Sequence, residues 1–251
     1  MDIETSHDPP ALADLTAPET FVLRYAPAKL DAEPLKLALQ ELVAGGALRL
    51  VHVSRRLGRG GRPVLVPGPA YEQPAARALA PVLALHAELG EALPVPDLAK
   101  AARKAFGGHG GYAEREVAPV LEARGLLMVE RRAGVRARSR YHWTDMGREV
   151  EDALEQWLDQ ARRGTTTARL REGGAAVLLL HHLYPRPGTL EHAFARPLDP
   201  CDGDITLAAA AWSDPASVET LDDLASAFAW IDVGFPAGGD GGGGGGDGGG
   251  G

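Results

Sequence analysis

Apolar side chains follow two different periods over residues 33–67. Leucines stand at helical spacing over 33–44, and the pair Gly45–Gly46 that follows is typical of a helix end. The stretch ALRLVHV at 47–53 then alternates with a period of two, and RPVLVP at 62–67 is a second short apolar run. This order predicts a helix followed by a β-hairpin.

The same order returns between residues 113 and 144. Apolar positions over 113–124 predict a helix that ends at Gly125. The stretches LLMVE at 126–130 and RYHWT at 140–144 predict two paired strands. The chain therefore repeats a unit of helix, glycine, strand, basic turn and strand.

A long amphipathic helix is predicted after the second hairpin, over residues 146–163. Thr144 or Asp145 is a suitable N-cap for it. Acidic residues come early in this helix and arginines come late, as the helix dipole prefers. Its apolar face comprises Val150, Leu154, Trp157 and Leu158.

Helical patterns cover much of the remaining chain, at 73–93, at 95–108 and in several apolar segments after Gly173. We therefore predict a mainly α fold: a helical domain with two helix–β-hairpin units that resemble winged helices, and a disordered glycine-rich C-terminal tail. The expected divisions are a disordered lead-in at 1–14, a first helix–hairpin unit at 15–70, helices and a second unit at 71–163, helical packing segments at 164–235 and the tail at 236–251.

Composition indicates a globular protein of a reducing compartment. The 251 residues, 45% of them hydrophobic, are enough to bury a sizeable core. Cys201 is the only cysteine, which excludes a disulfide within the chain and a cysteine-based zinc site. The N-terminal stretch lacks the features of a signal peptide, and the longest apolar run is far shorter than the roughly 20 residues that span a bilayer. These features predict a cytoplasmic protein, which a peripheral position at a membrane would also fit.

Two arginine clusters occupy the turns of the predicted hairpins, although the chain as a whole carries a net charge of −8. Two interpretations stay open. The arginines bind phosphate, on a lipid headgroup or on nucleic acid, or they are only the solvated tips of the hairpins. The candidate phosphate- or headgroup-binding residues are Arg55, Arg56, Arg59 and Arg62 in the first cluster and Arg131, Arg132, Arg136, Arg138, Arg140 and Trp143 in the second.

The neighbours of each cluster help to separate these interpretations. Trp143 favours a membrane surface at the second cluster, because an indole beside arginines is typical of a membrane interface; a tryptophan packed under the hairpin is the structural alternative. For the first cluster, the solvated turn is the preferred interpretation. The helices before both hairpins weigh against DNA, because their glutamates repel a phosphate backbone. These glutamates are Glu33, Glu41, Glu114, Glu116 and Glu122.

The sequence contains no pattern typical of an enzyme, a metal site or a cofactor site. The adjacent His181 and His182 point in different directions on a helix and lack the His-Glu-x-x-His spacing of a zinc site. The glycine-rich stretches GRGGRP and GGHGGY lack the Lys-Ser/Thr pair of a phosphate-binding loop. We therefore expect a non-enzymatic protein without metal or cofactor, and an enzyme acting on a small molecule is the weakest alternative.

A resemblance to a known family adds to these expectations. The run EREVAPVLEARGLLMVERRAGVRARSRYHWTDMGREVEDALEQWLDQ, followed by TARLREGGAAVLLLHHLYPRPGTLEHAF, resembles the Golgi phosphoprotein 3 family, which includes bacterial members. The likeness covers residues 20–195. It implies a mainly α fold with a β-hairpin and, as in the eukaryotic members, binding of phosphatidylinositol 4-phosphate and recruitment of partners. The chain departs from the family where arginines for the phosphoinositide are expected, because it has Glu114, Arg115 and Glu116 there.

A second, weaker likeness concerns the two ends of the chain. The stretch LTAPETFVLRYAPAKLDAEPLKLALQELVAGGALRL and the glycine-rich tail are similar to the cytosolic part of uncharacterised bacterial membrane proteins. Together these observations predict a protein that contacts an anionic membrane surface or a protein partner through its basic hairpins. The alternative is a tandem winged-helix DNA-binding regulator that uses the same arginines.

Overall fold

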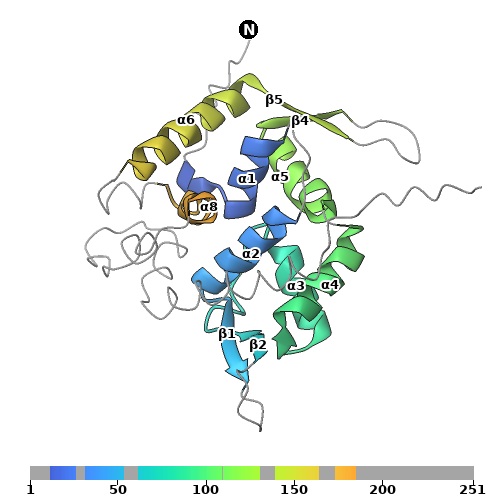
Figure 1. The fold of residues 1–251 in the computed structure, drawn as a ribbon. Coiled ribbons are helices and arrows are strands. Elements are labelled where there is room, and N and C mark those ends of the chain that lie inside the picture. Colours follow the sequence, from blue (N-terminus) through green and yellow to red (C-terminus); the bar gives the residue numbers. More distant parts are fainter. Residues whose placement is uncertain are drawn as a thin grey trace, which may run out of the picture.

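The computed structural model describes residues 12–26, 32–53, 62–108, 110–130, 139–163 and 173–184. Helices hold 61% of the described residues, so the fold is mainly α (Figure 1). In chain order the elements are the 3-10 turn η1 (Leu12–Asp14), α1 (Ala17–Tyr25), α2 (Glu33–Ala44), β1 (Leu48–Val53), β2 (Arg62–Pro67), α3 (Ala80–Leu89), β3 (Leu93–Pro94), α4 (Val95–Phe106), the π-helical turn η2 (Ala113–Val117), α5 (Ala118–Ala123), β4 (Leu127–Glu130), β5 (Arg140–Trp143), α6 (Asp145–Arg162) and α8 (Ala176–Leu183).

Local sequence signals explain where the main helices begin and end. Thr16 caps α1 in a capping box with Glu19, the S/T-x-x-E pattern that the stretch TAPE carries. Thr144 caps α6 by accepting a hydrogen bond from the Gly147 amide, which confirms one of the two N-caps predicted from the sequence. Helix α2 ends at Gly45, as predicted, and Gly46 follows with a positive φ of 70°.

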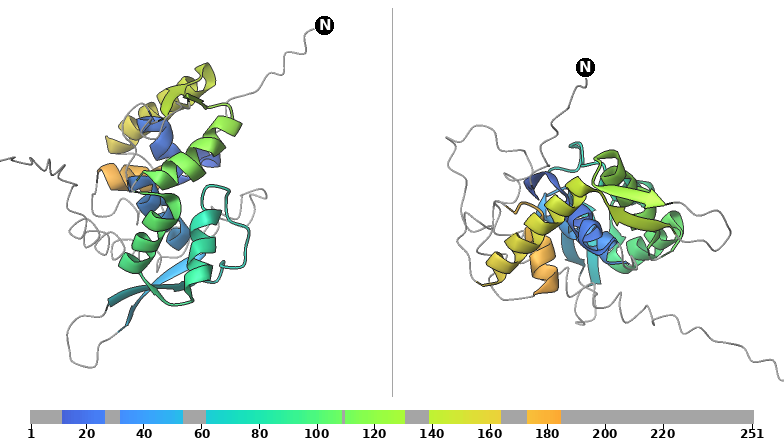
Figure 2. Two further views of the ribbon diagram at one scale, coloured as in Figure 1. Left: turned by 90° about the vertical axis from the view of Figure 1, so that its right-hand side faces the viewer. Right: turned by 90° about the horizontal axis from the view of Figure 1, so that it is seen from above.

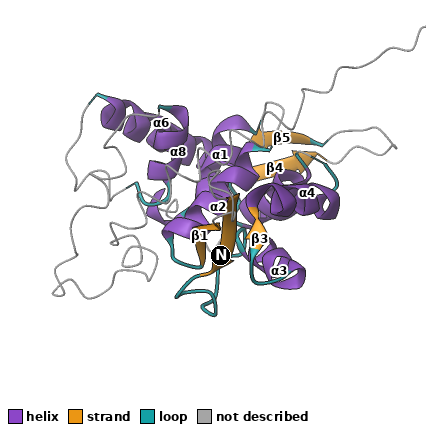
Figure 3. Ribbon diagram, turned by 60° about the horizontal axis from the view of Figure 1, so that its bottom comes forward, coloured by secondary structure: helices purple, strands orange, loops and turns teal. Residues whose placement is uncertain are grey.

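The strands form two small antiparallel sheets (Figure 3). In the first sheet β1 pairs with β2, in the register Leu48↔Pro67 to Val53↔Arg62. Strand β3 adds to the other edge of β2 through only two residues, which is too short a run for the sequence pattern to reveal. In the second sheet β4 pairs with β5, in the register Leu127↔Trp143 to Glu130↔Arg140.

The central helix of the fold is α1, which packs against α2, α5, α6 and α8 (Figures 1 and 2). One hydrophobic cluster draws buried residues from all the described α-helices and from β1, β2, β4 and β5. Its fully buried members include Val22, Leu37, Leu98, Leu121 and Leu154. The predicted face of α6 is confirmed, because Val150, Leu154, Trp157 and Leu158 are all buried.

Two segments predicted from the sequence have other limits in the structure. Residues 12–14 form the turn η1, so the lead-in predicted over 1–14 is too long. The helix predicted over 73–93 is shorter, because residues before Ala80 form turns and Gly90, with a φ of 121°, ends α3. The segments 15–70 and 71–163 also share a sheet and a core, because β3 pairs with β2.

The helix predicted over 113–124 forms as two joined pieces, η2 and α5. Pro119 stands where they meet and has no amide hydrogen to donate to the preceding turn, so the regular α-helical ladder is interrupted there. Gly125, with a φ of 71°, follows the second piece as predicted. Within the described ranges no helix has the length and apolar content needed to cross a membrane. The predicted segments at 188–235 and the glycine-rich tail lie outside the described residues.

Candidate functional site

Most of the candidate arginines fall in segments 54–61 and 131–138, which lie outside the described residues. This applies to Arg55, Arg56 and Arg59 and to Arg131, Arg132, Arg136 and Arg138. Arg62 opens β2, and only its backbone is described. The structure therefore describes the side chains of Arg140 and Trp143, both on β5.

The two strand pairs that carry the arginine clusters lie at different ends of the molecule. In Figure 1, β1 and β2 are at the bottom, whereas β4 and β5 are at the upper right, and Figure 2 agrees. Helices α1, α2 and α5 lie between them (Figure 1). The bases of the two hairpins therefore do not form one common surface, and the second hairpin has to be considered by itself.

An open cleft of about 510 Å³ lies at the base of the second hairpin. Ala26, just after α1, closes one side, and Arg148 in the first turns of α6 closes another. The remaining lining residues are Ser139, Arg140, Tyr141, His142 and Trp143. The cleft thus collects two guanidinium groups and an imidazole.

The pleat of the second sheet separates a core face from a solvent face. Leu127 and Tyr141 are buried, whereas Met128, Arg140 and His142 are exposed. Met128 stands opposite His142 in the register and is 58% exposed, one of two large apolar side chains among the described residues with such exposure. The solvent face of the hairpin therefore combines cations with an apolar side chain.

The ion pairs around the cleft are long and exposed. His142 Nε2 lies 3.7 Å from Glu130 Oε2, and an Arg148 Nη1 lies 3.9 Å from an Asp145 carboxylate oxygen. Pairs of this kind contribute little to stability, because water screens both partners. The guanidinium of Arg148 therefore stays available to an anionic ligand, since little free energy holds it to Asp145.

Trp143 takes a structural position at this site. Its side chain is half-buried, and its indole N–H donates to the carbonyl oxygen of Leu23 over 2.6 Å. This carbonyl belongs to the last turn of α1, where the helix itself supplies no donor. The bond joins the hairpin to α1, so the polar group that a membrane-interface tryptophan would offer is already used within the protein.

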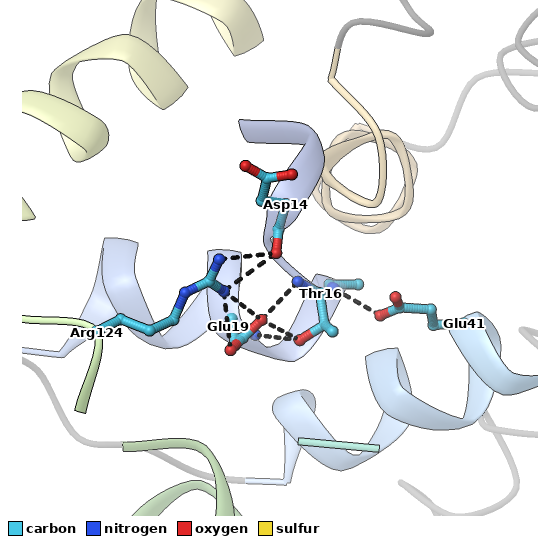
Figure 4. A network of polar contacts seen from close by, with 6 residues as sticks. Asp14, Thr16, Glu19, Glu41 and Arg124 are labelled. Atoms are coloured by element: carbon cyan, nitrogen blue, oxygen red, sulfur yellow. Dashed lines mark hydrogen bonds and ion pairs between the residues drawn. The ribbon is translucent and has the colours of Figure 1, made fainter. Parts of the chain in front are cut away.

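A buried polar network lies at the N-terminus of α1 (Figure 4). The Glu19 carboxylate accepts hydrogen bonds from the Thr16 amide at 2.7 Å and the Thr16 hydroxyl at 2.8 Å. Arg124 lies 3.4 Å from the same carboxylate and donates to the Asp14 carbonyl oxygen at 3.1 Å. Each polar group therefore has a partner, and the network ties α5 to the start of α1.

Glu41 approaches the same helix end from α2. Its carboxylate accepts a hydrogen bond from the Ala17 amide at 2.6 Å. The pKa of Glu41 is raised to about 8, mainly by burial. The hydrogen bond from Ala17 lowers this pKa, and the charge of Glu19 raises it, but both effects are smaller than that of burial. The buried hydroxyl of Tyr112 donates to the Ala78 carbonyl, and burial holds its pKa above the usual value. Glu41 thus acts as a cap for α1, supplied by another helix.

Two of the described histidines have partners within the protein. His86 is fully buried, with Nδ1 3.2 Å from the Tyr71 hydroxyl and Nε2 3.3 Å from the Leu65 carbonyl oxygen. His182 Nε2 lies 3.0 Å from Glu33, which ties α8 to α2. Within the described part of the chain, histidine, cysteine, aspartate and glutamate side chains form no group of three or more that is suited to a metal ion.

The burial of α2 bears on the nucleic-acid alternative. All twelve residues of α2 are buried or half-buried, and none is exposed. A recognition helix has to present side chains to base edges in the major groove. In the first unit the helix before the hairpin is therefore unsuited to that role.

Among the residues of the cleft and its surface that sequence reasoning missed are Met128, His142 and Arg148. A signal for the first two was present, because alternation within LLMVE and RYHWT puts Met128 and His142 opposite to the core-facing positions. Arg148 had no such signal, since it joins the site only when α6 packs beside β5. No protein-family model matches the chain, and no curated protein matches it either.

Proposed function

We propose that the protein is a non-enzymatic peripheral membrane protein of the Golgi phosphoprotein 3 type, which contacts anionic phospholipid headgroups through its second hairpin. The observation that carries the proposal is the cleft that gathers Arg140, His142 and Arg148 beside the exposed Met128. Guanidinium groups bind phosphate oxygens bidentately, and an apolar side chain next to them favours the headgroup–acyl boundary.

The segment between the two strands supplies the excess of positive charge. Among the described groups, the two charges of Arg140 and Arg148 are matched in number by Glu130, which lies near His142, and Asp145, which lies near Arg148. Residues 131–138, RRAGVRAR, add four arginines and no acidic residue. We regard α5 with β4 and β5 as a winged-helix-like unit whose wing is this segment, and we propose that the wing touches phosphate. A cytoplasmic location with reversible membrane contact follows from this proposal.

The direct test is co-sedimentation of the full chain with vesicles. Phosphatidylcholine vesicles should bind little protein, and vesicles with added phosphatidylserine should bind much more. Each arginine near an anionic surface contributes about 1 kcal/mol, so R140A/R148A should weaken binding by roughly tenfold or more. The quadruple variant R131A/R132A/R136A/R138A should abolish vesicle binding. Added salt should weaken vesicle binding of the wild type, because salt screens exposed charge.

The matched control is R49A/R163A, which removes the same charge from two exposed arginines away from the cleft. It should bind like the wild type. Equal binding to neutral and anionic vesicles, or equal loss in the control, would refute the proposal. Vesicles with phosphatidylinositol 4-phosphate at matched charge test headgroup preference. A preference that R140A/R148A removes supports the family resemblance.

A further inference from the structure

A second cationic surface lies on α4, apart from the hairpin site. A groove of about 770 Å³ is lined there by Lys100, Arg103 and Lys104 together with Asp97, Ala101 and Gly108. The three basic residues are exposed and stand at i, i+3 and i+4, so they share one helix face. Within the described chain, no ion pair engages the ammonium groups of Lys100 or Lys104.

Arg115 extends this surface beyond the end of α4. The helix ends at Gly107, whose φ of 82° favours glycine. The Arg115 guanidinium lies 2.7 Å from the position that a Cβ of Gly107 would take. A fourth exposed cation therefore sits against the glycine turn that follows the groove.

The distribution of charge along the chain points to an occupant. Residues 197–251 contain ten of the 34 acidic residues and none of the 26 lysines and arginines. The net charge of −8 therefore divides into +2 for residues 1–196 and −10 for residues 197–251. Glu219, Asp222 and Asp223 are the densest acidic group there, and their spacing repeats that of Lys100, Arg103 and Lys104.

We propose that the cationic groove of α4 is a docking surface for an acidic segment of the same chain, residues 219–223. The segment carries three negative charges and the groove three positive ones, so the two attract each other. About 35 residues separate Tyr184, at the end of α8, from Glu219, and an extended chain of that length far exceeds the width of a domain of this size. Because the segment is tethered, it reaches a high effective concentration at the groove, so weak exposed pairs suffice.

The lysine content of the chain makes this contact measurable. The chain has four lysines, Lys29, Lys36, Lys100 and Lys104, and Lys36 is buried against Glu33. A carbodiimide joins an amine to a carboxylate only when the two are in contact. In the full chain, mass spectrometry should find conjugates between Lys100 or Lys104 and Glu219, Asp222 or Asp223. These conjugates should fall by about tenfold when salt is raised from about 50 mM to about 500 mM.

Charge exchange provides the decisive variants. The full-length triple variant E219Q/D222N/D223N should lose the conjugates of both lysines. In K100D/K104D the partners are both acidic, so no conjugate should form. The combined variant K100D/K104D/D222K/D223K should restore the conjugates, with the carboxylates now on α4 and the amines now at positions 222 and 223. Circular dichroism of each variant establishes that it is folded.

Three results would overturn the proposal. The first is the absence of conjugates at Lys100 and Lys104, and the second is an even spread over all acidic residues of 197–251. The third is a conjugate that forms only between isotopically heavy and light chains in a mixture, which would assign the groove to a second copy. Loss of vesicle binding in K100D/K104D without any such conjugate would assign the groove to the membrane instead. The proposal does not depend on the headgroup site, since it concerns a different surface.

Discussion

Replacement of Glu41 by glutamine should stabilise the protein, and the gain should grow with pH. Glu41 lies on α2 and accepts a hydrogen bond from the Ala17 amide, and burial raises its pKa from 4.5 to about 8. Glutamine keeps an oxygen that accepts the same bond and carries no charge to bury. The substitution therefore removes the cost of ionisation and retains the cap of α1.

The magnitude follows from the two pKa values of Glu41. One pKa unit corresponds to about 1.4 kcal/mol. Near neutral pH the side chain is ionised in the unfolded chain and largely protonated in the folded protein, which costs folding roughly 3 kcal/mol before solvent screening. Glu41 is half-buried, so we expect E41Q to recover about 1–2 kcal/mol at about pH 7.

The sign of the pH dependence is specific. The folded pKa of Glu41 lies above the unfolded value, so this group makes the wild type less stable as pH rises from about 4.5 to about 8. Urea unfolding of wild type and E41Q at about pH 4.5, 7 and 8.5 should show free energies of unfolding that diverge with rising pH. A difference that is constant with pH, or a loss of stability in E41Q above about pH 7, would refute the reasoning.

Glu33 provides a control of opposite sign on the same helix. Burial alone would raise the pKa of Glu33, but the close contact with His182 and the hydrogen bond from Lys36 outweigh burial and hold this pKa at about 2. Its folded pKa lies below the unfolded value, so its contribution is present above about pH 4.5 and is lost as pH falls toward about 2. E33Q should therefore destabilise the protein where E41Q stabilises it.

Two further substitutions test the packing around the second hairpin. G147A should lower the free energy of unfolding by about 3 kcal/mol or more, because a Cβ at this position would lie 1.9 Å from the Leu126 carbonyl oxygen; R148A, one residue on, should lose far less in the same denaturant titration. W143F should cost about 1–2 kcal/mol, because the Leu23 carbonyl oxygen loses its donor. If Trp143 has only a structural role, folded W143F should bind vesicles like the wild type. A loss of vesicle binding at unchanged stability would instead indicate that the indole ring of Trp143 contacts the membrane.

The sequence contained the signals for most helices, because those signals are local. Helix α2 with its terminal Gly45, the Thr144 cap and the buried face of α6 all follow from residue spacing within a few turns. Helix α1 begins at a local signal of the same kind, the capping box within TAPE. The paired strands also begin and end near their predicted limits, since alternation and glycine mark them.

Only the tertiary structure decided the features that depend on distant residues. The two-residue strand β3 forms because the edge of β2 is free to pair with it, and two residues are too few to show a strand pattern in the sequence. The raised pKa of Glu41 depends on the desolvation of its carboxylate against the start of α1. The cleft that contains Arg140 and Arg148 depends on the packing of α6 beside β5. Burial and proximity between residues far apart in the chain are properties of packing. The arginines were therefore visible in the sequence, whereas the surface that gathers two of them was decided by the fold.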